Sequence, residues 1–252
     1  MTVGYRDFEF DLPGALLVRL VEVLDGMEAA PLDDEGLSSI PEAQGVYQLF
    51  LDGQLTYIGK TDAEAGLAKR LLRHSRKILH RQGLDPRRVT FKAVRIFVFT
   101  AIDLETQLIR HYTGKDGTPW NGSGFGANDP GRERDTSKPG SFDSDFPIDI
   151  DRPLEIDLVG TATAAEVALR LKAALPYTLR FQSAGKGSRK PHPELAQTVV
   201  TMSPAAITAR SALMELTRQL PSGWQTTMLS ALLIMYKEDR DTYPSAIILA
   251  RS

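Results

Sequence analysis

The sequence contains no cysteine, which excludes disulfide bonds and zinc sites built from cysteine. Long apolar runs are also absent, since the longest late one, residues 228–236, is too short and too interrupted to span a bilayer. The first residues are acidic and show no basic segment followed by an apolar one, so no secretory signal is expected. These absences are compatible with a reducing cytoplasm, and we expect a cytoplasmic protein that has no membrane partner.

Net charge is nearly lacking as well, at −2 over 252 residues, but the charge is unevenly distributed. Residues 1–44 hold two basic and ten acidic residues, for −8, whereas residues 69–95 hold ten basic residues and one acidic residue, for +9. A polyanion bound at the basic segment would gain from neutralisation of its phosphates. A solvated helix face is the simpler explanation for an arbitrary charge run.

A β-hairpin is expected early in the chain. Two apolar runs, at residues 46–51 and 55–58, flank an Asp-Gly-Gln sequence that is typical of a tight turn. Side chains alternate along a strand, so Tyr47 and Tyr57 can lie on the same face of a small sheet. Residues 89–100 are rich in Val, Phe and Ile and are expected to form the third strand.

A strongly basic helix is expected to begin near Glu64. Arg70 and His74 are four residues apart, so their side chains lie on one face of this helix. The helix therefore offers a permanent cation and an imidazole together. Its inward stripe consists of residues at helical spacing, namely Leu67, Leu71, Ser75, Ile78 and Leu79.

A further helix is expected over residues 103–113, with Asp103 at its N-cap. It carries Glu105 on the side shared by Leu108 and Tyr112. A carboxylate at the edge of an apolar face needs a partner, so this position favours a metal ion or another cation.

These residues together resemble the GIY-YIG nuclease superfamily. Its two name motifs match Gly45-Val46-Tyr47 and Tyr57-Ile58-Gly59, ten residues apart, and Arg70, Glu105 and Asn121 follow in the family's order. Valine stands where the first motif has isoleucine, which is a conservative departure. The resemblance implies an α+β fold with a small three-stranded antiparallel sheet flanked by helices.

Within the superfamily, the chain is most similar to the type II restriction endonucleases. His74 and the segments at residues 122–126 and 129–135 carry this similarity. It implies sequence-specific hydrolysis of double-stranded DNA that depends on one Mg²⁺ ion, with Mn²⁺ as the alternative metal. It also implies a homodimer on a palindromic site and a DNA methyltransferase encoded nearby, which protects the host's own sites.

The resemblance assigns each residue a task in phosphodiester hydrolysis. Glu105 would hold the single metal ion, which polarises the phosphate. Arg70 would stabilise the charge of the transition state. Tyr47 or His74, acting as a linked pair, would take the proton of the attacking water, and either one is a candidate for the general base.

Two further residues of the set have supporting tasks. Tyr57 would orient the water or the phosphate. Asn121 would hold its loop in place or bind the phosphate. Any one of these residue types, taken alone, is more often a packing or surface residue, and only their order along the chain favours function.

Several basic residues are candidates for DNA contacts. Arg132 and Arg134 lie in a loop expected over residues 114–151, where ion pairs with their acidic neighbours explain them equally well. A basic loop between two later strands is expected to enter a DNA groove, although such loops are more often simply solvated. The complete set is Lys60, Lys69, Arg73, Lys77, Arg132, Arg134, Lys186, Arg189 and Lys190.

Three segments are expected along the chain. Residues 1–44 form a leading segment with a helix over residues 13–27, and residues 45–150 form the nuclease core with its active-site loop. Residues 151–252 form an α+β region for DNA recognition or dimerisation. Its expected strands are residues 154–159, 177–182, 198–202 and 246–250, and its expected helices are residues 163–175, 204–220 and 224–237.

Two other functions remain open at this point. A repair or homing nuclease would use the same catalytic module, but such enzymes usually add a helix-hairpin or a DNA-binding tail on a long linker. A non-catalytic protein would keep the scaffold and bind DNA without cutting it.

Overall fold

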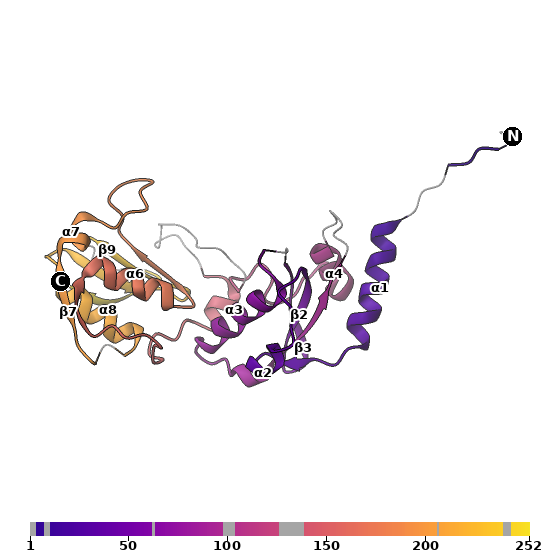
Figure 1. Cartoon of the computed structure of the whole chain (residues 1–252), viewed down its shortest axis with the longest axis horizontal. Coiled ribbons are helices and arrows are strands. Elements are labelled where there is room, and N and C mark those ends of the chain that lie inside the picture. The colour runs from indigo at the N-terminus through magenta and orange to yellow at the C-terminus, as the bar shows by residue number, and fades with distance from the viewer. Residues whose placement is uncertain are drawn as a thin grey trace. The chain divides into compact units, whose positions relative to one another are not determined.

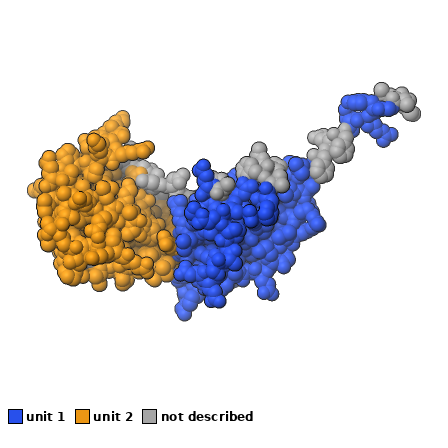
Figure 2. Space-filling view, viewed as in Figure 1, with its two compact units in different colours: residues 1–75, 85–121 blue, residues 76–84, 122–252 orange. Residues whose placement is uncertain are grey.

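The computed structural model describes residues 4–7, 11–61, 64–97, 104–125, 139–205, 207–238 and 243–252. The chain forms two compact units, which Figure 1 and Figure 2 show. Unit 1 consists of Met1–Ser75 and Asp85–Asn121, and unit 2 consists of Arg76–Leu84 and Gly122–Ser252. The expected segments 1–44, 45–150 and 151–252 stay a prediction. Among the described helices, none has the length and apolar character needed to cross a membrane.

Unit 1 contains a four-stranded antiparallel sheet in the order β1-β4-β2-β3. The prediction of three strands is therefore wrong, because this sheet has four. The added strand is short, pairs Ala30 with Phe91 and Pro31 with Thr90, and lies at an edge, where proline is tolerated. A strand of two residues is too short to show the alternation by which a sequence pattern reveals a strand. The strands are β1 (Ala30–Pro31), β2 (Gly45–Leu51), β3 (Gln54–Thr61) and β4 (Val89–Arg95).

The predicted hairpin is confirmed in β2 and β3. Its two-residue turn has positive φ at Asp52 (51°) and Gly53 (78°), the conformation of a type I′ turn. The register pairs Tyr47 with Gly59 and Leu49 with Tyr57. Residues opposite one another point to the same side, so both tyrosines share one face of the sheet, as their alternation predicted.

Helices cover both faces of this sheet. On the face of Val46 and Ile58, α1 and α4 pack through apolar side chains that include Leu24 and Leu108. On the face of the tyrosines lies α3, because a Cβ atom added to Gly45 would meet the Leu67 side chain at 2.7 Å. The helical elements are α1 (Leu12–Gly26), α2 (Asp34–Leu37), α3 (Leu67–Leu79), the 3₁₀ helix η1 (Pro86–Arg88) and α4 (Leu104–Thr113).

The structure describes the N-cap of α1 but not the residue before α4. The expected helix 13–27 is confirmed as α1, with Asp11 accepting a hydrogen bond from Gly14 and proline in the first turn. For α4, Asp103 lies outside the described residues, so its role as N-cap stays a prediction.

Unit 2 contains a four-stranded sheet in the order β10-β8-β9-β6 and a two-stranded sheet of β5 and β7. Helices α6 and α8 pack on the larger sheet (Figure 1), and their Leu171 and Leu213 share a core with Leu233 and Met235. The elements are α5 (Ser141–Asp145), β5 (Gly160–Thr163), α6 (Ala164–Ala174), β6 (Thr178–Phe181), α7 (Pro193–Gln197), β7 (Val199–Met202), α8 (Ala209–Arg218), β8 (Trp224–Met228), β9 (Leu232–Lys237) and β10 (Ile247–Arg251).

The expected helix over residues 224–237 is wrong, because this stretch forms the antiparallel strands β8 and β9. In β9, Leu233 and Met235 face one core while Leu232 and Ile234 face another. A strand that is buried on both sides has a continuous apolar sequence, which periodicity does not distinguish from a buried helix.

Two other expectations in this unit also need correction. The expected strand over residues 154–159 does not form, and β5 begins only at Gly160. Leu154, Ile156 and Leu158 nevertheless pack against one hydrophobic core, and the Leu154 N–H donates to the carbonyl of Ile207 at 2.7 Å. The expected helix 204–220 is shorter, because Thr208 caps α8 and the helix ends at Arg218. Alternation predicts which side chains are buried, but a ladder also needs a partner strand.

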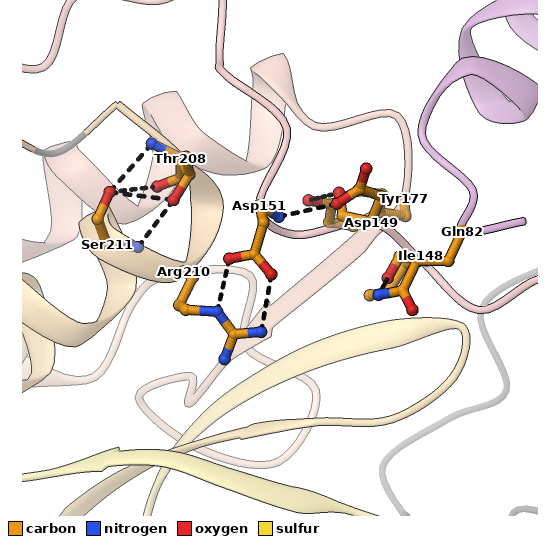
Figure 3. Close-up of polar contacts among 8 residues, drawn as sticks. All are labelled: Gln82, Ile148, Asp149, Asp151, Tyr177, Thr208, Arg210 and Ser211. Atoms are coloured by element: carbon orange, nitrogen blue, oxygen red, sulfur yellow. Dashed lines mark hydrogen bonds and ion pairs between the residues drawn. The ribbon is translucent and has the colours of Figure 1, made fainter.

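Residues 147–151 are held by hydrogen bonds from several parts of unit 2 (Figure 3). Arg210 of α8 forms a bidentate ion pair with Asp151, at 2.6 and 2.9 Å. Gln82 donates its side-chain amide to the carbonyl of Ile148 at 3.2 Å. The hydroxyl of Tyr177 reaches the carbonyl of Asp149 at 3.5 Å. The last two bonds satisfy backbone carbonyls of this segment.

A buried ion pair holds the residues directly before this segment, at α5 and Phe146. Arg81 donates to Asp143 of α5 and to the carbonyl of Phe146, both at 2.8 Å, and its guanidinium lies 4.8 Å from the centroid of the Phe142 ring. The two charged side chains are only 2% and 8% exposed. A Cβ atom on Gly124 would lie 2.1 Å from the Asp143 carboxylate, so glycine is needed where the chain passes this pair.

We expect Arg81→Met to lower the free energy of unfolding by about 3–5 kcal/mol, because it leaves the Asp143 carboxylate buried without its cation. Arg87→Met is the matched control, since its ion pair with Asp85 is exposed and screened by water, so its loss should change the free energy of unfolding little. Urea unfolding measures both changes. The double variant Arg81→Met/Asp143→Leu should recover part of the loss, and equal effects of Arg81→Met and Arg87→Met would contradict the assignment.

Candidate active site

The candidate site centres on the hydroxyl of Tyr47, in the middle of β2. This oxygen lies 2.8 Å from Nε2 of His74 and accepts a hydrogen bond from Nε of Arg70 at 3.3 Å. Arg70 and His74 come from adjacent turns of α3, as their spacing predicted. The sheet and the helix therefore bring a phenol, an imidazole and a guanidinium together around one oxygen atom.

Tyr57 of β3 completes a group of three rings. Its ring centroid lies 6.0 Å from that of Tyr47 and 5.4 Å from that of His74, and the Tyr47 and His74 rings are 5.5 Å apart. All three side chains are buried. The rings are tilted relative to one another, an arrangement that aromatic pairs prefer to face-to-face stacking. The site is thus held rigid by packing as well as by hydrogen bonds.

Gly59 makes this packing possible. A Cβ atom at this position would lie 2.4 Å from the Tyr47 hydroxyl oxygen and 2.8 Å from a ring carbon of Tyr57. Any larger residue would push the two rings apart. Sequence reasoning included Gly59 only as the last letter of a motif, whereas the structure supplies the steric reason for it.

The surroundings of Tyr47 keep its phenol protonated. Burial raises the pKa of Tyr47 far above its ordinary range, the proximity of Tyr57 raises it further, and Arg70 opposes both effects only in part. Burial lowers the pKa of Arg70, but its contacts with Tyr47 and Tyr57 outweigh this and raise it overall. At neutral pH the pair is therefore a neutral phenol beside a permanent cation. Tyr47 is a poor proton acceptor unless it can pass a proton on.

Asn121 fastens its segment to the open edge of β3. Its side-chain amide donates to the carbonyl of Ile58 at 2.8 Å, and its side-chain oxygen accepts from the Ile58 N–H at 2.9 Å. The hydroxyl of Thr118 donates to the same oxygen, and Trp120 N–H donates to the carbonyl of Thr56 at 2.9 Å. These contacts match the first of its two expected tasks, holding the loop. Sequence reasoning missed Thr118, although its position three residues before Asn121 is a typical spacing for such a turn.

Glu105 lies in the first turn of α4 and is half-buried. Its neighbour Leu104 packs in the core with Val46 and Ile58. Within the described ranges, no three His, Asp or Glu side chains are grouped to hold a metal ion. A single carboxylate nevertheless suits Mg²⁺, which is often bound through one or two carboxylates, with waters and substrate phosphates as the other ligands. The donor chemistry of Glu105 thus fits the expected metal.

The expected DNA-contacting residues of unit 1 and α3 differ in their surroundings. Lys60 and Arg73 are exposed. Lys69 is exposed too and pairs with Glu42 at 2.8 Å. The Lys77 ammonium, by contrast, donates to the carbonyls of Gly124 and Phe125 and lies over two aromatic rings, so its contacts within unit 2 are structural.

The remaining basic candidates lie outside unit 1. Arg132 and Arg134 fall outside the described residues. The side chains of Lys186, Arg189 and Lys190 are exposed on a tight loop. Hydrogen bonds hold this loop, from Ala184 N–H to the Lys190 carbonyl at 2.9 Å and from Ser188 N–H to the Gly185 carbonyl at 3.0 Å. Three cations are thus presented on a defined backbone.

The raised pKa of Tyr47 predicts an alkaline effect on stability. The contribution of its buried phenol is complete below about pH 10, where an unfolded tyrosine begins to ionise, and is lost as the pH rises further. Tyr47→Phe has no such proton to lose, so its free energy of unfolding should fall less than that of the wild type above about pH 10. Urea unfolding at a series of pH values tests this. Tyr236→Phe, which retains Tyr47, should follow the wild type, and parallel curves for Tyr47→Phe and the wild type would refute the prediction.

No protein-family model matches this sequence, and no curated protein matches it either. The phenol, imidazole and guanidinium are held within hydrogen-bond distance on one face of the sheet. Glu105 lies on α4, which packs on the opposite face through Leu104 and Leu108.

Proposed function

We propose that this protein is a GIY-YIG endonuclease of the type II restriction class, which cuts double-stranded DNA at a specific site. The observation that carries the proposal is the Tyr47 hydroxyl, bonded to His74 at 2.8 Å and to Arg70 at 3.3 Å. A phenol linked to an imidazole offers a path for a proton, and a guanidinium beside it offers charge for a phosphate. Phosphodiester hydrolysis needs both.

His74 is the base in this proposal, and Tyr47 relays the proton. The attacking water gives a proton to the Tyr47 oxygen as the phenol gives its own proton to Nε2 of His74, so the phenol stays neutral and the imidazole becomes imidazolium. The raised pKa of Tyr47 supports this order, because a free phenolate is disfavoured there. An imidazole titrates near pH 6.5 and is a suitable acceptor at neutral pH.

Arg70 controls access to the relay. In the structure its Nε donates to the Tyr47 hydroxyl, which occupies a lone pair that the proton from the water would need. A phosphate that draws the guanidinium toward itself would free this lone pair. Arg70 would then stabilise the extra negative charge on phosphorus, for which its planar fork is well suited.

Glu105 would hold one Mg²⁺ ion, or Mn²⁺ in its place. When bound, the metal supplies positive charge to the phosphate and to the departing oxygen. Tyr57 would orient the water or phosphate, since its ring lies close to both Tyr47 and His74. Asn121 would act by holding its segment on β3.

DNA binding and assembly follow from the same proposal. Lys60 and Arg73 are exposed and would contact phosphates, and the ion pair of Lys69 with Glu42 is exposed enough to be exchanged for one. One such site cuts one strand, so a two-fold homodimer on a palindrome would cut both. A DNA methyltransferase encoded beside this chain would protect the host.

A non-catalytic DNA-binding protein is the second candidate. The observation in its favour is the complete burial of the Tyr47 side chain, which leaves no room for water in the form described. Such a protein would bind DNA with a steep salt dependence and leave it intact.

The decisive experiment is incubation of plasmid and phage DNA with the wild type and with Glu105→Ala, each in Mg²⁺ and in EDTA. We expect discrete fragments from the wild type in Mg²⁺ alone and none from Glu105→Ala, because the metal would lose its protein ligand. Glu28→Ala, which removes an exposed carboxylate after α1, is the control and should cut like the wild type. Sequencing the fragment ends gives the site. Intact DNA with binding retained would favour the non-catalytic candidate.

We expect Arg70→Lys to lower kcat by about 100-fold or more with a smaller effect on KM, because a lysine cannot reproduce the planar pair of hydrogen bonds to a phosphate. Arg76→Lys, an exposed exchange on the same helix, is the matched control and should retain nearly full kcat. Single-turnover cleavage in Mg²⁺ measures both. Equal rates for the two variants would remove Arg70 from the mechanism.

A further inference from the structure

Phe97, just beyond β4, is exposed to an unusual degree. Its side chain is 78% exposed, more than any other large apolar side chain that the structure describes. The guanidinium carbon of Arg95 lies 4.3 Å from the centroid of its ring, so the cation stacks on the aromatic face. Arg95 is exposed as well. The pair therefore presents a flat apolar ring and a cation at one point of the surface.

The backbone of this pair is held rigidly by Gln44, the residue directly before the first motif. The N–H of Ile96 donates to the carbonyl of Gln44 at 3.1 Å, and the Gln44 side chain donates to the carbonyl of Ile96 at 3.1 Å. Ile96 itself packs against the core of unit 1. Because the N–H and the carbonyl of Ile96 are both hydrogen-bonded and its side chain is packed, the flanking Arg95 and Phe97 are held in one geometry. A rigid pair loses little conformational entropy on binding.

The register of the sheet puts Arg95 on the face of the candidate site. Ala93 pairs with Tyr47 and Arg95 pairs with Gly45, so Arg95 points to the same side as Tyr47, two residues further along β4. That distance is about 7 Å along the strand. Gly45 has no side chain, and the Leu67 side chain of α3 fills the space beside it on this face.

Among the residues that the structure describes, no carboxylate forms an ion pair with Arg95. The positive charge of Arg95 is therefore not neutralised by them. A flat aromatic surface beside a free cation suits a ligand that is itself flat and anionic. Nucleic acid has both properties, since its bases stack on aromatic rings and its phosphates pair with guanidinium groups.

We propose that Arg95 and Phe97 form a stacking platform for the bound DNA. Phe97 stacks on a base next to the cleaved bond and loosens its base step, while Arg95 turns from the ring to the adjacent phosphate. This rests on the proposed function, because it takes DNA as the ligand, and it names the part of unit 1 that deforms it. Apolar side chains placed at a base step are a general way to bend a duplex.

The test uses the full-length protein and a duplex that carries the site read from the cleaved plasmid ends, with 2-aminopurine on either side of the cleaved bond. In EDTA the wild type should raise the 2-aminopurine fluorescence, which reports unstacking. We expect Phe97→Ala to abolish this rise and to weaken the Kd by about tenfold or more. Phe97→Trp, which keeps an aromatic face, should retain both. Arg95→Ala should weaken the Kd and flatten its salt dependence.

Tyr5→Ala is the control, since it removes another exposed aromatic side chain, and it should match the wild type. If the wild type cuts its site and Phe97→Ala binds, unstacks and cuts equally well, the platform is overturned while the nuclease proposal stands. If Phe97→Ala instead changes only the sedimentation of the free protein, the surface is a contact between copies and the platform is likewise overturned. If the wild type neither binds nor cuts DNA, the proposed function is wrong and the platform is overturned with it.

Discussion

The hydroxyl of Tyr47 is the point on which the rest of unit 1 depends. A buried hydroxyl must be hydrogen-bonded, and here an imidazole and a guanidinium from one helix serve as its partners. That requirement determines which face α3 covers and how His74 and Arg70 are oriented. It also requires glycine at position 59, since only hydrogen there leaves room for the ring. Packing and chemistry are therefore inseparable at this position.

The opposite face of the same sheet is covered by α1 and α4. The acidic leading segment is fastened there by polar contacts as well as by its apolar stripe. Tyr112 of α4 donates to Asp25 at 2.7 Å, and Lys92 of β4 donates to the carbonyl of Leu24 at 2.8 Å. Burial, together with the bond to Asp25, raises the pKa of Tyr112 to about 12. Helix α1 thereby closes the back of the sheet and leaves the tyrosine face for chemistry.

The basic run of residues 69–95 is not a single surface. On α3, Arg70 belongs to the candidate site, whereas Lys77 binds carbonyls inside unit 2. Arg81, just beyond the helix, binds a carboxylate and a carbonyl there. Arg88 forms an exposed ion pair with Asp52. A charge count along the chain cannot separate these cases, because the partner of each cation is distant in sequence. What is left for a polyanion is a smaller set of exposed cations, to which Arg95 belongs.

The sequence by itself determined the hairpin, α1, α4 and the pairing of Arg70 with His74, because turn residues, caps and spacing act between near neighbours. It also placed Tyr47 and Tyr57 on one face. Only the tertiary structure decided that residues 224–237 form strands, that a two-residue strand joins the first sheet, and that Asn121 bonds to Ile58. Each of these depends on a partner far along the chain. Local patterns predict what a segment can bury, whereas long-range packing decides what it pairs with.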